Sequence, residues 1–245
     1  METNQDYEDF ISTISHELRT PLTSIKGFSQ TLLASWDRLD DASKKKFIKI
    51  IEEQSQRLIN LVENMLTVTK MRKKDILRFN EFDIKPVIDQ TIMILKTQYS
   101  SQKFVCNYVN NIPKLFADKD KFQQIMTNLL ENSAKYSLED KVTNIEISAK
   151  DNDIYIEISN KGLKISQDDY EKIFTKFSRI DNPLTRKVQG SGLGLYITKN
   201  LTEKIGGNIS VKSESIPNSK LDKITFTLVF PVKNQEEQIR IKCKQ

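Results

Sequence analysis

The stretch that decides the fold of the N-terminal third is residues 10–22, Phe10-Ile-Ser-Thr-Ile-Ser-His-Glu-Leu-Arg-Thr-Pro-Leu22. Apolar residues recur in it every three or four positions, and the series continues beyond residue 22: Phe10, Ile14, Leu18, Leu22, Ile25, Phe28 and Leu32. This spacing predicts a long amphipathic helix with one apolar stripe. His16 is the only histidine in the chain and lies beside the stripe, so we expect its imidazole at the stripe's edge, in contact with water.

An exposed imidazole can act as a nitrogen nucleophile at neutral pH without strong tuning by its surroundings. Glu17 lies about 100° around the helix from His16, so it cannot stack on the ring and can only reach round to a ring nitrogen and fix the tautomer. Thr20 is four residues on and shares the face of His16. The simpler interpretation is a lone surface histidine without chemistry.

The seven residues His16-Glu-Leu-Arg-Thr-Pro-Leu22 resemble the phosphoacceptor box of sensor histidine kinases, which lies in their HisKA dimerisation and phosphotransfer domain. The resemblance implies that His16 accepts a phosphoryl group from ATP, while Glu17 orients the ring and takes up proton charge. It also implies a phosphatase reaction on a response regulator, in which Thr20 would position a water.

Residues from about 7 to 35 and from about 42 to 74 are predicted to form two long helices, joined by a turn that Asp40 or Asp41 would cap. Pro21 predicts a kink in the first helix. Two amphipathic helices with a short link form an antiparallel hairpin, and one hairpin is too small to bury both apolar stripes. We therefore expect a homodimer through residues 7–74, as a dimeric four-helix bundle. A coiled-coil tether without chemistry is the alternative for these helices alone.

The composition argues against several other classes of protein. The net charge of +5 is spread along the chain without a basic block, so nucleic-acid binding is not expected. The chain has only two cysteines, Cys106 and Cys243, which lie far apart in sequence, and only one histidine. This composition argues against a zinc site and favours reduced thiols. Without an apolar run long enough to span a bilayer, we expect a cytoplasmic chain that meets a membrane only through a segment upstream of it.

After residue 76 the pattern changes to mixed helix and strand, so we expect a second domain at 77–235 and a polar tail at 236–245. Helices are expected at about 84–99, 118–136, 170–177 and 190–205. Strands are expected at about 104–109, 144–149, 154–159, 209–213 and 224–230, with a short extended piece at 115–118. The predicted class is α+β, with the helical hairpin followed by an α/β sandwich.

Two sequence segments in this second domain have residues suited to binding a nucleotide. Asn128, Asn132 and Lys135 fall at steps of four and three, so they share one helix face that could hold Mg²⁺ and the phosphates it bridges. An ordinary solvated polar face is the alternative. The glycine-rich string Gly190-Ser-Gly-Leu-Gly-Leu195 at a helix start would let backbone N–H groups approach a phosphate. It does not follow the strand of a short βαβ unit, so we reject a dinucleotide-binding fold.

Together the strings resemble the ATP-binding domain of the same kinases, within the gyrase, Hsp90, histidine kinase and MutL superfamily. The Asn128–Tyr136 string resembles the N box, residues 174–179 the F box and residues 190–195 the G2 box, with an ATP lid at about 178–189. The resemblance implies ATP and Mg²⁺ as cofactors, with Asn132 on the metal. It implies these ATP-binding residues: Asn128, Asn132, Lys135, Tyr136, Asn160, Gly162, Ile165, Phe177, Arg179, Gly190, Ser191, Gly192, Leu193, Gly194 and Leu195.

Several positions depart from the patterns of these families, among them Lys164, which replaces a glycine and could crowd the backbone there or reach a phosphate. Asn160 replaces the aspartate that accepts a hydrogen bond from the adenine amino group, so the bond would lose its charge assistance and ATP would bind about tenfold more weakly. Asn128 stands where the ATPases of the superfamily carry a water-activating glutamate. An amide cannot take a proton from water, so ATP should be spared for His16.

The sequence therefore predicts a homodimeric histidine kinase core that phosphorylates His16 and passes the phosphoryl group to an aspartate of a response regulator. The alternative is a dimeric scaffold or phosphatase that has lost productive ATP binding. A superfamily ATPase is a third interpretation, but it leaves His16 and its neighbours unexplained.

Overall fold

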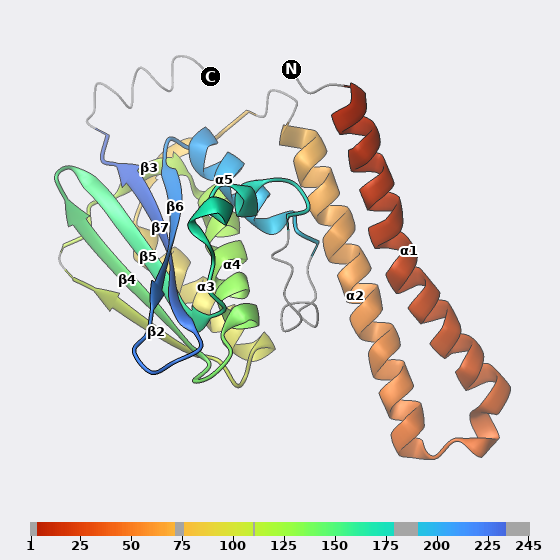
Figure 1. Cartoon of the computed structure of the whole chain (residues 1–245). Helices are drawn as coiled ribbons and strands as arrows, with labels where there is room; N and C mark the ends of the chain where they lie inside the picture. Colours follow the sequence, from red (N-terminus) through yellow and green to blue (C-terminus); the bar gives the residue numbers. More distant parts are fainter. Residues whose placement is uncertain (1–3, 72–75, 110, 179–190, 234–245) are drawn as a thin grey trace. The chain divides into compact units, whose positions relative to one another are not determined.

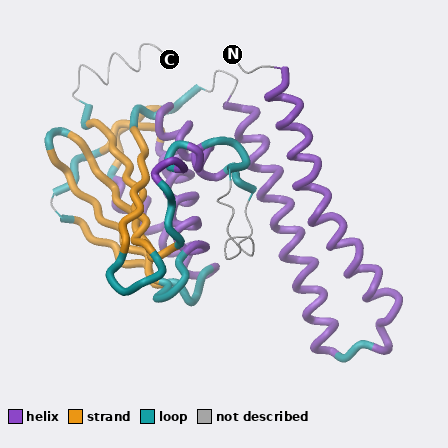
Figure 2. The backbone as a smooth tube through the Cα atoms, viewed as in Figure 1, coloured by secondary structure: helices purple, strands orange, loops and turns teal. Residues whose placement is uncertain are grey.

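The structure is a computed structural model that describes residues 4–71, 76–109, 111–178 and 191–233. The chain divides into two compact units, a helical one from its N-terminal part and an α/β one from the part that follows. Figure 1 shows their elements in sequence colours and Figure 2 their secondary structure. Each unit is described by itself.

The helical unit is an antiparallel hairpin of α1 (Asn4–Ser35) and α2 (Asp41–Met71), joined through the 3₁₀ turn η1 (Trp36–Arg38) (Figure 1). Asp40 caps α2, because its Oδ1 accepts a hydrogen bond of 2.6 Å from the backbone N–H of Ser43. Hydrogen bonds with the side chain of Ser43 and then with its backbone lower the pKa of the Asp40 carboxyl. The expected hairpin is confirmed, and its buried residues include Ile14, Leu32, Leu61 and Val68.

A second set of apolar side chains on the hairpin is exposed. On α1 these are Ile11, Leu22 and Leu33, which are spaced by eleven residues and so lie along one face. On α2 they are Ile48, Ile59, Val62 and Leu66. We call these two sets the uncovered stripes. One hairpin therefore leaves apolar surface open on both of its helices.

The α/β unit contains a five-stranded sheet in the order β2-β4-β5-β7-β6. Its strands are β2 (Lys103–Tyr108), β4 (Val142–Lys150), β5 (Asp153–Gly162), β6 (Asn208–Ser215) and β7 (Asp222–Pro231). β2 runs parallel to β4, and the other neighbours are antiparallel. Three helices lie along one face of the sheet (Figure 1): α3 (Ile84–Gln98), α4 (Lys119–Tyr136) and α5 (Gly194–Lys204). The predicted α/β sandwich is confirmed.

Buried and exposed residues follow one another along each strand and helix with the period of that element. Along β5, Ile154, Ile156 and Ile158 are fully buried while Glu157 between them is exposed. Asp118 is the N-cap of α4, and its side chain accepts hydrogen bonds from the N–H groups of residues 120 and 121. Because its cap and its buried face are both set, α4 presents its remaining polar face in a defined direction.

Two predicted elements differ from the structure, and one strand of the structure was not predicted. The helix expected at 170–177 is wrong: two 3₁₀ turns stand there, η2 (Gln167–Asp169) and η3 (Lys172–Phe174). Helix α5 begins at Gly194 rather than at Gly190, because Gly192 has φ of +68°, outside the helical region. A strand at 79–82 was not expected, but β1 (Phe79–Phe82) pairs antiparallel with β3 (Leu115–Asp118).

Phe122→Ala should lower the free energy of unfolding of the α/β unit by about 3–5 kcal/mol, the usual loss for truncating a buried phenylalanine. Phe122 is fully buried, with its ring 5.6 Å from Phe82 and 5.8 Å from Phe230 between centroids. Chemical denaturation followed by circular dichroism measures the change. Met93→Ala, at a side chain 73% exposed on α3, is the control and should change it by less than about 0.5 kcal/mol. A loss below about 1 kcal/mol for Phe122→Ala would contradict the core as described.

Candidate functional site

The imidazole of His16 is exposed on α1, as its place beside the apolar stripe predicts. At about 100° per residue, His16 lies about 120° around α1 from Leu22 and the uncovered stripe. Thr20 Oγ1 donates to the carbonyl oxygen of His16 at 3.3 Å, one helical turn away. A partner covering the uncovered stripe would therefore leave this imidazole open to a second reactant.

Glu17 is held by the other helix of the hairpin. Its Oε2 accepts a hydrogen bond of 3.1 Å from Nη2 of Arg57 on α2, and both side chains are about one quarter exposed or less. Arg57 was not among the predicted site residues, since only the hairpin brings it to Glu17. The structure thus directs the carboxylate across the hairpin, where it ties α1 to α2 beside His16.

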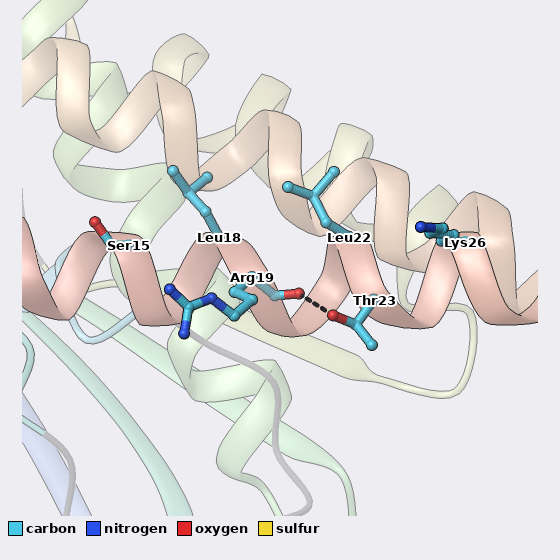
Figure 3. A pocket seen from close by; sticks show the side chains of 6 residues that line it. All are labelled: Ser15, Leu18, Arg19, Leu22, Thr23 and Lys26. Atoms are coloured by element: carbon cyan, nitrogen blue, oxygen red, sulfur yellow. Dashed lines mark hydrogen bonds between the residues drawn. The ribbon is translucent and has the colours of Figure 1, made fainter.

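A shallow pocket of about 340 Å³ lies along α1, between Ser15, the residue before His16, and Lys26 (Figure 3). We call it the α1 groove, and it is lined by Ser15, Leu18, Arg19, Leu22, Thr23 and Lys26. Thr23 Oγ1 donates to the carbonyl oxygen of Arg19 at 2.8 Å. In Figure 3 the side chains of Leu18 and Leu22 extend to one side of the helix and those of Arg19 and Thr23 to the other. The groove is thus apolar along one side with two cationic residues at its border.

The polar face of α4 carries two amides with the properties of ligand-binding groups. Asn128 Nδ2 is buried and has no hydrogen-bond partner among the described residues. An unpaired buried donor costs about 1–3 kcal/mol, so a group that accepts from it would remove that cost. Nδ2 of Asn132 lies 3.9 Å from the position that a Cβ on Gly194 would take. The two amides therefore lie on the side of α4 that faces the start of α5.

Lys135 shares this face but is already paired. Its Nζ donates to Glu131 Oε2 at 2.8 Å. Burial acts to lower the pKa of Lys135, but the Glu131 carboxylate and the Tyr99 hydroxyl outweigh it and raise that pKa. Burial also raises the pKa of Tyr99, a residue that the sequence did not indicate. The ammonium thus stays charged and is directed to Glu131 in this structure.

The end of β5 brings Asn160 and Gly162 close to Tyr136, the last residue of α4. A Cβ on Gly162 would lie 3.1 Å from the backbone oxygen of Tyr136 and 3.2 Å from Asn160 Nδ2, so only glycine leaves this space open. Further along, the backbone N–H of Ile165 donates to Ser213 Oγ at 3.1 Å, and this bond holds the segment after β5 to β6. The predicted residues Asn160, Gly162 and Ile165 therefore lie at the end of β5 or just after it.

The glycine string before α5 approaches Phe177. A Cβ on Gly192 would lie 2.7 Å from the Phe177 backbone, and Phe177 itself has φ of +58°. Leu193 is buried, while Ser191 and Leu195 are half-buried. The predicted residues Arg179 and Gly190, and the lid at 178–189 apart from Ser178, lie outside the described residues. Gly192 thus has both a steric and a conformational reason to be glycine.

The residues present fit a nucleotide with a magnesium ion. The unpaired amide of Asn128, the approach of Gly194 to Asn132 and the space at Gly162 are all on one side of α4 or at its end. Within the described ranges, no three His, Cys, Asp or Glu side chains group so that they could hold a metal ion. A magnesium ion held by an amide oxygen of this face would take its other ligands from phosphates and water. Of the helices described, none is long and apolar enough to cross a membrane.

Two family models match the chain. The His Kinase A (phospho-acceptor) domain matches residues 6–74, and the Histidine kinase-, DNA gyrase B-, and HSP90-like ATPase domain matches residues 117–234. The sensor histidine kinase WalK of Bacillus subtilis is 33% identical over 241 residues, 96% of this chain and 38% of that protein. The signal transduction histidine-protein kinase ArlS of Staphylococcus haemolyticus is 32% identical over 214 residues, 87% of this chain and 47% of that protein. The chain spans less than half the length of these two relatives.

Solved structures share the fold. The Acinetobacter baumannii histidine kinase AdeS superposes with a TM-score of 0.66 at 21% identity, over 89% of this chain and 98% of that one. The histidine kinase ThkA, solved in complex with the response regulator TrrA, superposes with a TM-score of 0.70 at 23% identity, over 92% of this chain and 61% of that one.

The fold and the site define a class, in which a phosphoacceptor helical hairpin precedes an ATPase domain of the gyrase and HSP90 type. The chain belongs to the sensor histidine kinase family.

Proposed function

We propose that this chain is an ATP-dependent, autophosphorylating protein histidine kinase of a two-component system. One polypeptide carries both an exposed imidazole on a hairpin and the polar face of α4 with its unpaired Asn128 amide. This combination is the main support for the proposal, because phosphoryl transfer from ATP requires both a nucleophile and a site that holds the nucleotide.

In the proposed reaction a ring nitrogen of His16 attacks the γ-phosphorus of ATP while the bond to the ADP oxygen breaks. Asn132 would hold Mg²⁺, which would neutralise the charge that develops on the phosphates. Asn128 would donate its free N–H to a phosphate oxygen. Gly194, at the N-terminus of α5, would leave room for a phosphate beside Asn132. The Glu17–Arg57 pair holds the hairpin at the level of His16.

The phosphoryl group would then pass to an aspartate of a response regulator that docks on the hairpin near His16. The complex of ThkA with TrrA supports a partner of this kind. Thr20, exposed one turn from His16, would position a water for dephosphorylation of the regulator. We propose residues 1–76 as the phosphotransfer domain, 77–235 as the ATP-binding domain and 236–245 as a polar tail, all in the cytoplasm.

The test of this function is labelling with γ-labelled ATP and Mg²⁺. The expected product is label on the protein that is labile in acid and stable in base, as a phosphohistidine is. A folded chain that neither binds nucleotide nor takes up label would contradict the proposal. It would favour the second candidate, a dimeric scaffold or phosphatase, which the missing carboxylate at Asn160 supports.

We further propose that a second copy of the chain covers the uncovered stripes and the α1 groove, which includes Leu22 and so lies on the same face of α1. Two hairpins that meet there would form a four-helix bundle through residues 7–74. His16 lies about 120° around α1 from Leu22 and would remain accessible in such a dimer.

Leu22→Lys should shift the chain from dimer to monomer, with the dimer dissociation constant raised at least about tenfold, because an ammonium would enter an apolar interface. Light scattering after size-exclusion chromatography measures the mass across protein concentrations. Thr31→Lys is the matched control, since Thr31 is exposed and lies about 180° around α1 from Leu22. A monomeric wild type, or equal dissociation constants for the two variants, would contradict the dimer.

A further inference from the structure

Strand β2 forms one edge of the five-stranded sheet, and β4 is its single partner among the described strands. The backbone N–H groups of Lys103 and Val109 donate to carbonyl oxygens of the chain in and just before β4. In a parallel pair this means that the odd-numbered residues of β2 direct their backbone groups to β4. The backbone groups of Phe104, Cys106 and Tyr108 therefore point away from the sheet, where no described residue bonds to them.

The two edges of this sheet differ in charge. An open edge can pair with another strand, and natural proteins protect it with charged residues or cover it. The β6 edge is protected in this way, since Lys212 and Glu214 form an ion pair of 2.7 Å along it. Strand β2 carries one charged residue, Lys103, and its Cys106 and Tyr108 side chains are half-buried. The β2 edge thus lacks the protection that the other edge has.

A segment with the pattern of a strand follows at residues 239–244, outside the described residues. It reads Ile-Arg-Ile-Lys-Cys-Lys, in which apolar and basic residues alternate. We call it the C-terminal segment. Its period of two predicts a strand with one apolar face and one face of three cations.

The C-terminal segment can reach β2 from the end of β7. The N–H of Val232 donates to the carbonyl oxygen of Asn152 at 2.9 Å, between β4 and β5. β2 ends toward the same end of the sheet, because it runs parallel to β4, with Tyr108 opposite Ile147. From there to the open side of β2 is at most about 17 Å, from up to three strand spacings and the length of β4 beyond Ile147. Residues 233–238 can span about 20 Å, so the segment would run antiparallel to β2.

The charge of the sheet face that the helices leave open is complementary to the cations of the segment. Glu146 on β4 and Glu157 on β5 lie directly opposite each other on this face, and both are exposed. Like charges placed in this way are destabilising, and among the described residues no cation pairs with either carboxylate. Asn107 of β2 is the neighbour of Glu146 on the same face. A strand added beyond Asn107 with its cations on this face would bring them toward both carboxylates.

We propose that the C-terminal segment adds to the edge of β2 as a sixth strand, antiparallel to it. Its apolar residues would cover the half-buried side chains of Cys106 and Tyr108, and its cations would lie toward Glu146 and Glu157. The backbone groups of β2 that point away from the sheet would gain hydrogen-bond partners, as in other cases of strand addition. The inference concerns this edge alone and is independent of the proposed kinase reaction.

The test is hydrogen exchange of single amides in the full chain, measured by NMR at two protein concentrations. The amides of Phe104, Cys106 and Tyr108 are expected to exchange at least about tenfold more slowly than unprotected amides, because the segment would pair with this edge. Exchange at the unprotected rate, beside protection at Val105, would overturn the inference. Protection that falls on dilution would assign the edge to a second copy of the chain and would overturn it too.

Arg240→Pro and Ile241→Pro test the pairing itself. Neighbouring N–H groups of a strand point to opposite sides, so one of the two prolines would remove a donor that faces β2. At least one variant should therefore bring exchange of the three edge amides to within about threefold of the unprotected rate. Glu237→Pro, before the segment, is the control and should exchange as wild type does. Wild-type exchange in both variants would overturn the inference.

Glu146→Lys tests the face on which the cations lie. It should speed exchange of the same amides about two- to fivefold, because the cations of the segment would meet an ammonium. The substitution also removes the repulsion between Glu146 and Glu157, so an effect on the sheet alone would slow exchange instead. Glu203→Lys, the same change at an exposed position on α5, is the matched control and should leave the wild-type rates. Equal or slower exchange in Glu146→Lys would overturn the proposed arrangement.

Discussion

His16→Gln is expected to reduce labelling from γ-labelled ATP to background, at least about a 10³-fold loss, since replacing the attacking group removes the reaction itself. Glutamine keeps a polar side chain of similar reach, but its amide nitrogen is not a nucleophile. His16 is exposed, so the substitution should change the free energy of unfolding by no more than about 0.5 kcal/mol. Acid-labile, base-stable label is the quantity to measure, with the melting temperature alongside it.

The control for this variant is nucleotide binding, which should be as in wild type because His16 belongs to the helical unit and the proposed pocket to the α/β unit. Thr31→Gln, at an exposed position on the same helix, should label like wild type. Label that survives in His16→Gln would place the phosphoryl group on another residue and would remove the basis of the proposed mechanism.

Asn132→Ala is the second variant for which we expect a large effect. Loss of the amide should lower magnesium-dependent nucleotide affinity about 10–100-fold and labelling at least as much, because metal sites of this kind depend on each oriented ligand. Asn132 has its amide 3.9 Å from the Cβ position at Gly194, so alanine opens space there without removing a core contact. Calorimetry with and without Mg²⁺ measures the effect, since the gain from the ion should disappear in the variant.

Asn107→Ala on the exposed face of β2 is the control and should retain the full gain from Mg²⁺. If Asn132→Ala still labels within threefold of wild type, the ion is held elsewhere and Asn132 has no part in its coordination. Loss of binding with and without Mg²⁺ alike would instead indicate a phosphate contact rather than a metal ligand.

Local patterns in the sequence predicted much of this structure. The spacing of apolar residues predicted α1, α2 and α4, because a helix that buries one face must repeat with its own period. Alternation in the same way predicted β4 and β5. Even the cap at Asp40 was readable, since a short side chain bonds to an N–H only three residues away.

Elements that depend on distant partners were missed. β1 shows no alternation, with only its two end residues half-buried, and its pairing comes from β3 more than thirty residues later. The start of α5 was placed too early, because the positive φ of Gly192 accompanies its approach to Phe177 and follows from no local period. The pairing of Glu17 with Arg57 required the hairpin to close.

The sequence by itself determined the helical hairpin with an exposed histidine, the sheet that follows and the residue types of the nucleotide strings, since these depend on neighbours within a turn or two. Only the tertiary structure decided how those residue types are used. Asn160 Oδ1 accepts a hydrogen bond from Ser133 Oγ at 3.2 Å, and Ser133 Oγ lies 2.9 Å from Thr143 Oγ1, which accepts from Gln102 Nε2. Hydrogen bonds between residues far apart in the chain orient a buried amide, and no local pattern contains that information.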